Sequence, residues 1–87
     1  MTISRKAFFF KEATLTGSFV TVPLGMVSTN LRFVAVSTAA AEFSFNGTDT
    51  DGKVDTNDKV ATFDGVACDR VFVKGTGVLR IYAWTKN

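Results

Sequence analysis

The sequence predicts an all-β protein: a single small antiparallel β-sandwich, jelly-roll or immunoglobulin-like, with about seven strands. β-Branched and aromatic residues dominate, and apolar residues alternate with polar ones between interruptions by Gly, Asn, Asp and Ser. No segment has the period of an amphipathic helix. A chain of 87 residues allows one hydrophobic core, so residues 1–87 are expected to form one domain.

Seven segments carry the strand pattern, namely Ala7–Leu15, Ser18–Pro23, Leu31–Ser37, Glu42–Asn46, Val60–Asp64, Arg70–Lys74 and Val78–Thr85. The single proline, Pro23, is expected to end a strand because it has no N–H group for a ladder. Gly75-Thr76-Gly77 is expected to form a hairpin turn. The chain shows no internal repeat and no linker.

Several predicted strands have apolar side chains on both faces. Phe8-Phe9-Phe10 is apolar throughout, and so is Phe33-Val34-Ala35-Val36. In the last segment, small aliphatic residues form one face and an aromatic and cationic set forms the other. Because 46% of the residues are hydrophobic, the chain has more apolar side-chain surface than one small domain easily buries. We therefore expect subunit contacts through Phe8, Phe9, Phe10, Arg80, Tyr82 and Trp84. The alternative is that loops of the same chain cover these faces.

Composition argues against several functions. Ten basic and eight acidic residues give a net charge of +2, too little for a phosphate-backbone binder, so nucleic acid is an unlikely partner. There is no histidine to act as zinc ligand or general base, and the single cysteine, Cys68, cannot form an intrachain disulfide. No nucleophile–base pair or phosphate loop is apparent, so we expect neither enzymatic activity nor a cofactor. No apolar run reaches membrane-spanning length, and residues 1–6, with Arg5-Lys6, could form an extended basic arm.

The segment 46–58 is the most site-like, because it holds four aspartates and one lysine. Aligned with a helix–loop–helix calcium loop it matches in part, but Gly47 stands where the first ligand belongs. Asp, Asn, Gly and Thr are also the ordinary residues of a long connection. We therefore assign no metal site and keep only weak calcium candidates: Asp49, Asp51, Asp55 and Asp58.

The second half resembles the small β-sandwich virion proteins of tailed bacteriophages. The resemblance covers about residues 42–85 and is carried by the strand and Asn-Gly turn of Phe43–Gly47, by Asp69-Arg70-Val71-Phe72-Val73-Lys74, and by the terminal Arg80-Ile81-Tyr82-Ala83-Trp84. The pattern is loose and has no catalytic signature. It implies a structural subunit of the particle: a capsid decoration or cement protein, or a component near the portal or tail.

On this basis we expect a non-enzymatic capsid decoration protein that associates with itself, a trimer being favoured, and docks on other virion proteins such as the major capsid protein. Its place would be the virion, assembled in the host cytoplasm, without contact to a membrane. The alternative is a calcium-assisted glycan-binding module for host attachment, in which the acidic loop holds calcium and the Arg80/Tyr82/Trp84 face stacks on sugar.

Overall fold

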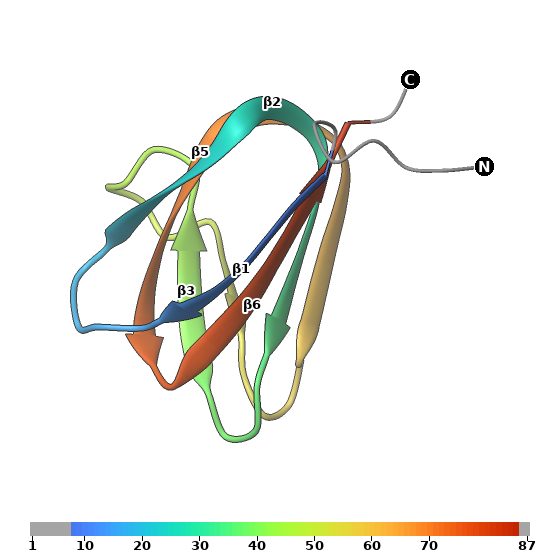
Figure 1. Cartoon of the computed structure of the whole chain (residues 1–87). Coiled ribbons are helices and arrows are strands. Elements are labelled where there is room, and N and C mark those ends of the chain that lie inside the picture. Colours follow the sequence, from blue (N-terminus) through green and yellow to red (C-terminus); the bar gives the residue numbers. More distant parts are fainter. Residues whose placement is uncertain (1–7, 86–87) are drawn as a thin grey trace.

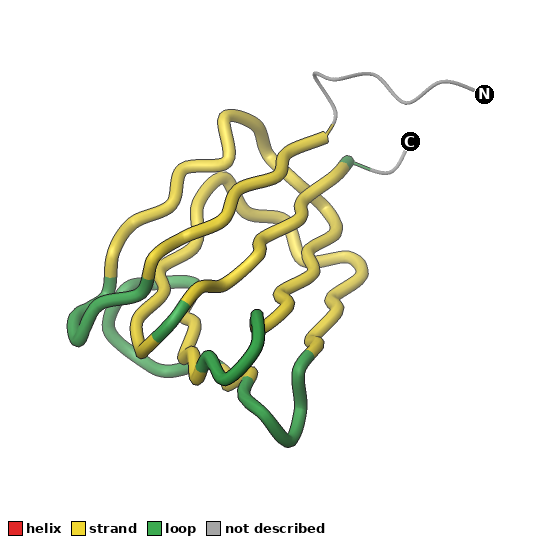
Figure 2. Tube along the Cα trace, turned by 60° about the horizontal axis from the view of Figure 1, so that its bottom comes forward, coloured by secondary structure: helices red, strands yellow, loops and turns green. Residues whose placement is uncertain are grey.

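The computed structural model describes residues 8–85, which fold entirely into strands and loops (Figures 1 and 2). Six strands form one antiparallel sheet in the order β1-β6-β2-β5-β3-β4. Their bounds are β1 Phe8–Thr14, β2 Val20–Ala35, β3 Ala40–Ser44, β4 Gly52–Val54, β5 Val60–Thr76 and β6 Val78–Trp84. The prediction of an all-β fold is therefore confirmed.

Two long, bent strands explain why the sheet is continuous. The sequence predicted four strands in the part of the chain that forms β2 and β5. The structure has only two long strands there, and both arch over one end of the molecule (Figure 1). Their pairing register breaks between Pro23 and Asn30, so the proline ends the regular ladder without ending the strand. Gly25 and Gly65 have positive φ angles of 74° and 82° in these bends. The bends fold one sheet over on itself, where the sequence predicted the two sheets of a sandwich.

The core lies between the two halves of the folded sheet. Phe33 of β2 stacks on Phe43 of β3 with ring centroids 4.5 Å apart, although β2 and β3 are not neighbours in the sheet. The alternation predicted for the last strand is confirmed, since its small aliphatic face is fully buried: Leu79, Ile81 and Ala83. Burial of these rings and aliphatic chains supplies most of the driving force for folding.

Several expected boundaries are wrong. The sequence pattern missed β4 because three residues inside a polar loop carry no periodic signal. Gly75-Thr76-Gly77 is not a hairpin turn, since it joins β5 to β6, which do not pair with each other. The strand predicted at Glu42–Asn46 lies two residues earlier, at Ala40–Ser44. Ala7 and the expected arm 1–6 are outside the described residues.

The described chain contains a structural repeat that the sequence did not reveal. In the sheet, β1 and β4 occupy equivalent positions at the two edges, β6 and β3 lie next to them, and β2 and β5 form the centre. Exchanging the two strands of each pair gives the same strand order, read from the opposite edge. Positive φ angles recur at the same interval: Gly25 and Gly65 are forty residues apart, and so are Ser37 and Gly77, which follow β2 and β5. The fold therefore consists of two intertwined three-stranded units related by an approximate two-fold axis.

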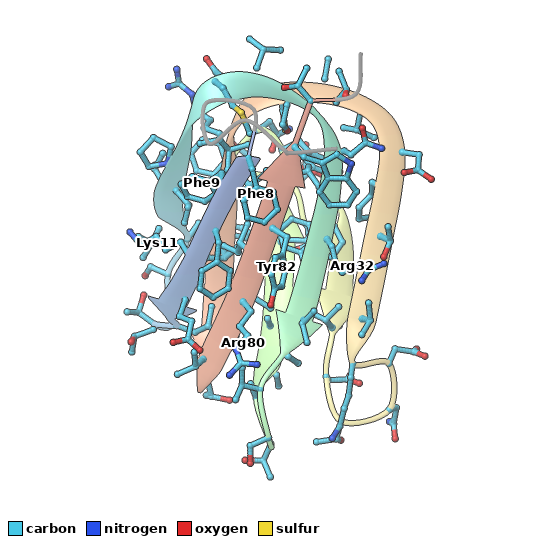
Figure 3. The ribbon with its side chains drawn as sticks, turned by 45° about the vertical axis from the view of Figure 1, so that its right-hand side comes forward. Phe8, Phe9, Lys11, Arg32, Arg80 and Tyr82 are labelled. Atoms are coloured by element: carbon cyan, nitrogen blue, oxygen red, sulfur yellow. The ribbon has the colours of Figure 1, made fainter. Side chains whose placement is uncertain are left out.

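The two edge strands are poorly suited to pairing with another sheet. Lys11 of β1 pairs in register with the fully buried Ile81 and so lies on the core side of the sheet, yet it is exposed at the free edge (Figure 3). A charge that points inward on an edge strand hinders edge-to-edge pairing. β4, at the other edge, has only three residues, Gly52–Val54. Neither edge of the sheet therefore favours pairing with another sheet.

Candidate interaction surface

One outer face of the sheet collects aromatic and cationic side chains from β1, β6, β2 and β5. The strand registers place Phe10, Tyr82 and Arg32 directly opposite one another in a row across three strands. The neighbouring rows complete a surface that we call the open face. It is formed by the aromatic, aliphatic and cationic residues Phe8, Phe10, Arg32, Val34, Val60, Arg80, Tyr82 and Trp84, together with the polar and acidic residues Glu12, Asn30, Thr62 and Asp64. Figure 3 views the molecule from this side, with Tyr82, Arg32 and Arg80 close together on β6 and β2.

Five of the six predicted interface residues belong to the open face. Phe10 is 47% exposed and packs its ring against Tyr82 at 4.9 Å between centroids, and Val60 on β5 is 52% exposed. Phe9 is the exception, because it pairs in register with the fully buried Ala83 and packs against the core. Strict alternation along the Phe8-Phe9-Phe10 run would have separated the middle ring from its neighbours.

The two arginines of the open face differ in their partners. The Arg80 guanidinium is 2.9 Å from the Glu12 carboxylate on the adjacent strand, and this hydrogen bond and ion pair raise the pKa of Arg80. Arg32 donates only to the Thr62 hydroxyl, at 3.2 Å, and has no carboxylate partner among the described residues. The sequence analysis missed Arg32, although one charge within the apolar run Leu31–Val34 was a usable signal.

The outer surface of the other half is covered by its own chain. Phe72 alternates with the buried Val71 and Val73 and so faces outward from β5. The loop between β3 and β4 folds over this ring, and a Cβ atom at Gly47 would lie 3.1 Å from it. A loop of the same chain therefore covers this outer face, which is not one of the faces for which the sequence raised that alternative.

The four acidic candidates lie in two separate loops on either side of β4. In the first loop, Asp49 accepts the side-chain amide of Asn46 at 2.9 Å, and Asp51 accepts the backbone N–H of Phe45 at 2.7 Å. Asp55 and Asp58 form the second loop, and no three acidic or cysteine side chains within residues 8–85 come together as metal ligands. The first loop rests on Phe72, away from the open face, so the two parts of the alternative glycan site do not adjoin.

The turn at Asp55 gives the fold a specific acid dependence. Its carboxylate accepts the backbone N–H groups of Asp58 at 3.1 Å and Asn57 at 2.9 Å, which lower its pKa from the ordinary 3.8. A carboxylate with a lowered pKa in the folded state stabilises the fold above its unfolded pKa, and that contribution is lost as the pH falls through the folded pKa.

We therefore expect the wild-type chain to be more stable than Asp55→Asn at neutral pH. The difference should shrink as the pH falls below 3.8 and through the lowered pKa of the folded state, because the carboxylate becomes protonated. Thermal unfolding of both proteins over this range measures it, and a difference that stays constant with pH would contradict the role assigned to this carboxylate.

The single cysteine lies at the bend, away from the open face. Its sulfur is 3.9 Å from the hydroxyl of Ser28, which is fully buried, and partial burial raises the pKa of the Cys68 thiol. A raised pKa disfavours the reactive thiolate. Cys68 therefore acts as a small residue packed against the core.

The described residues contain no helix long and apolar enough to cross a membrane. Comparisons with protein-family models, curated proteins and solved structures find no match to this chain. Of the described surfaces, the open face is the one with exposed aromatic and aliphatic side chains beside an unpaired arginine.

Proposed function

We propose that the chain is a non-enzymatic structural subunit that assembles through its open face, by contacts with itself and with larger partner proteins. The supporting observation is the row of Phe10, Tyr82 and Arg32, in which Tyr82 lies between the half-exposed ring of Phe10 and an arginine without an ion-pair partner. Aromatic residues and arginine are the side chains most enriched where protein interfaces gain their energy.

Removing the exposed apolar parts of this face from water favours association by about 25 cal/mol per Å² before the cost of immobilising the partners is subtracted. Folding within one chain does not achieve this removal, since Val60 and Phe10 stay about half exposed. A subunit in an assembly gains the free energy of removing these side chains from water, which the isolated chain does not gain.

The type of assembly we propose is a virus particle, with the chain as a capsid decoration protein docked on the major capsid protein. This rests on the resemblance of residues 42–85 to the virion proteins of tailed bacteriophages and on the all-β fold. In such a setting many equivalent sites lie close together, so a small contact surface suffices through multivalency.

The test uses antibodies raised against the purified chain and particles purified from an infected culture that expresses it. The proposal predicts regular labelling of intact particles by immunoelectron microscopy, together with the 9.4 kDa chain in the particle fraction by mass spectrometry. Recovery of the chain only from the soluble lysate, with unlabelled particles, would overturn it.

A further inference from the structure

The central row of the open face can pair with the same row of a second copy, because it holds both an aromatic ring and an unpaired guanidinium. Resting on the self-association in the proposed function, we propose that two chains pair face to face about a two-fold axis that runs along the strands, between β6 and β2. In this pair, Arg32 of each copy lies over the Tyr82 ring of the other.

The two sides of the open face are chemically different. On the side of β1 and β6 it presents aromatic rings, Phe10 and Tyr82 in the central row. On the side of β2 and β5 it presents Arg32 and Thr62 in the central row, with Val34 and Val60 in one neighbouring row and Asn30 and Asp64 in the other. Rotation about an axis parallel to the strands, between β6 and β2, lays each row of one copy on the same row of the other. In the central row, Tyr82 then meets Arg32 and Phe10 meets Thr62. Each copy supplies both halves of the contact, as a two-fold interface requires.

The unpaired guanidinium selects this orientation. Arg80 already has Glu12 and Arg70 has Asp69, whereas Arg32 is the described arginine without a carboxylate partner. An arginine over an aromatic ring is attracted by the negative π face, and the attraction grows when water is excluded. An axis across the strands would instead bring Arg32 against its own counterpart, and like charges brought together cost affinity.

Two features of the fold direct the second copy to this face. The inward charge of Lys11 and the shortness of β4 oppose pairing at the sheet edges. The approximate symmetry of the chain supplies the other feature. The face equivalent to the open face, around Phe72, is already covered by the loop that contains Gly47, whereas no described loop covers Tyr82 and Arg32.

The size of the face sets the strength expected of the pair. Four strands about 4.8 Å apart and five residues at about 3.4 Å each give a projected area of roughly 300 Å². Stable complexes bury about 800 Å² from each partner, so this pair belongs to the small, reversible class. We expect a dissociation constant of about 10 μM or weaker. A face that pairs with itself about a two-fold axis forms a dimer, whereas the sequence led us to expect a trimer.

Complementary variants test the contact by sedimentation equilibrium of the full chain up to about 0.5 mM. Arg32→Glu removes the cation, and Tyr82→Lys places a cation opposite Arg32. Each variant alone should dimerise at least about tenfold more weakly than wild type. Mixed together, they should pair again to within about threefold of wild type, because Glu at 32 then meets Lys at 82 in one contact while the other contact stays native. Arg70→Glu, the same charge change on the other half, is the control and should dimerise as wild type does.

The outcomes separate the two proposals. Recovery in the mixture, with a mass of two 9.4 kDa chains, supports the pairing. If wild type dimerises but neither variant weakens it, or if it forms a trimer, the two-fold pairing is overturned and the assembly function stands. Wild type that stays a monomer throughout removes self-association itself, and with it that part of the proposed function.

Discussion

Replacing Phe33 by alanine is expected to destabilise the protein by about 3–5 kcal/mol, enough to unfold much of a chain of this size. Phe33 is fully buried, stacks on Phe43 and meets the edge of Phe63 at 6.3 Å. These three rings come from strands on both halves of the folded sheet, so the cavity would open where the two halves meet. Urea unfolding followed by circular dichroism measures the loss.

Two comparisons make this result specific. Phe33→Leu keeps most of the volume and should cost only about 1–2 kcal/mol. Phe10→Ala removes the same ring from a half-exposed site on the open face and should cost about 1 kcal/mol or less when measured on dilute protein. Equal losses for Phe33→Ala and Phe10→Ala would contradict the core described here.

The second large effect is expected at Gly75, where β5 turns toward β6. Its φ angle is 139°, a conformation that side chains rarely adopt, and a Cβ atom there would lie 2.0 Å from the backbone oxygen of Ala40. Because backbone on both sides must move to relieve this contact, Gly75→Ala should cost about 3–5 kcal/mol.

Gly17 provides the matched control for this substitution. It lies in the exposed loop between β1 and β2, and a Cβ atom there would meet nothing within 4 Å. Gly17→Ala should leave the stability within about 1 kcal/mol of wild type. The same urea titration compares both variants, and a Gly75→Ala protein as stable as Gly17→Ala would mean that the close approach of β5 and β3 is wrong.

The sequence predicted the class of fold because alternation is a local property. Leu79, Ile81 and Ala83 show the period of two and are indeed buried. The bends could not be predicted in the same way. A glycine such as Gly25 or Gly65 interrupts a strand pattern whether the chain turns back or merely curves, and only the pairing partners decide between these outcomes.

The candidate surface was also predicted only in part, because local patterns show which residues are apolar but not which strands lie side by side. The aromatic side chains were recognised because they exceed what a core needs, but Phe9 was grouped with them although alternation assigns it to the core. Arg32 was missed because its importance depends on lying opposite Tyr82 and on having no carboxylate as an ion-pair partner. Both conditions join β2 to β6, which are far apart in the sequence, so no local pattern contains them.

The most direct test of assembly through the open face is to dilute the isotopically labelled full chain from about 0.5 mM to about 10 μM and follow its NMR spectrum. Concentration-dependent shifts are expected for the Trp84 indole, the Tyr82 ring and the Arg32 side chain, with none at Phe72. The chain contains one tryptophan and one tyrosine, so these signals are unambiguous. Spectra that do not change with concentration, or changes confined to the covered face around Phe72, would contradict the account.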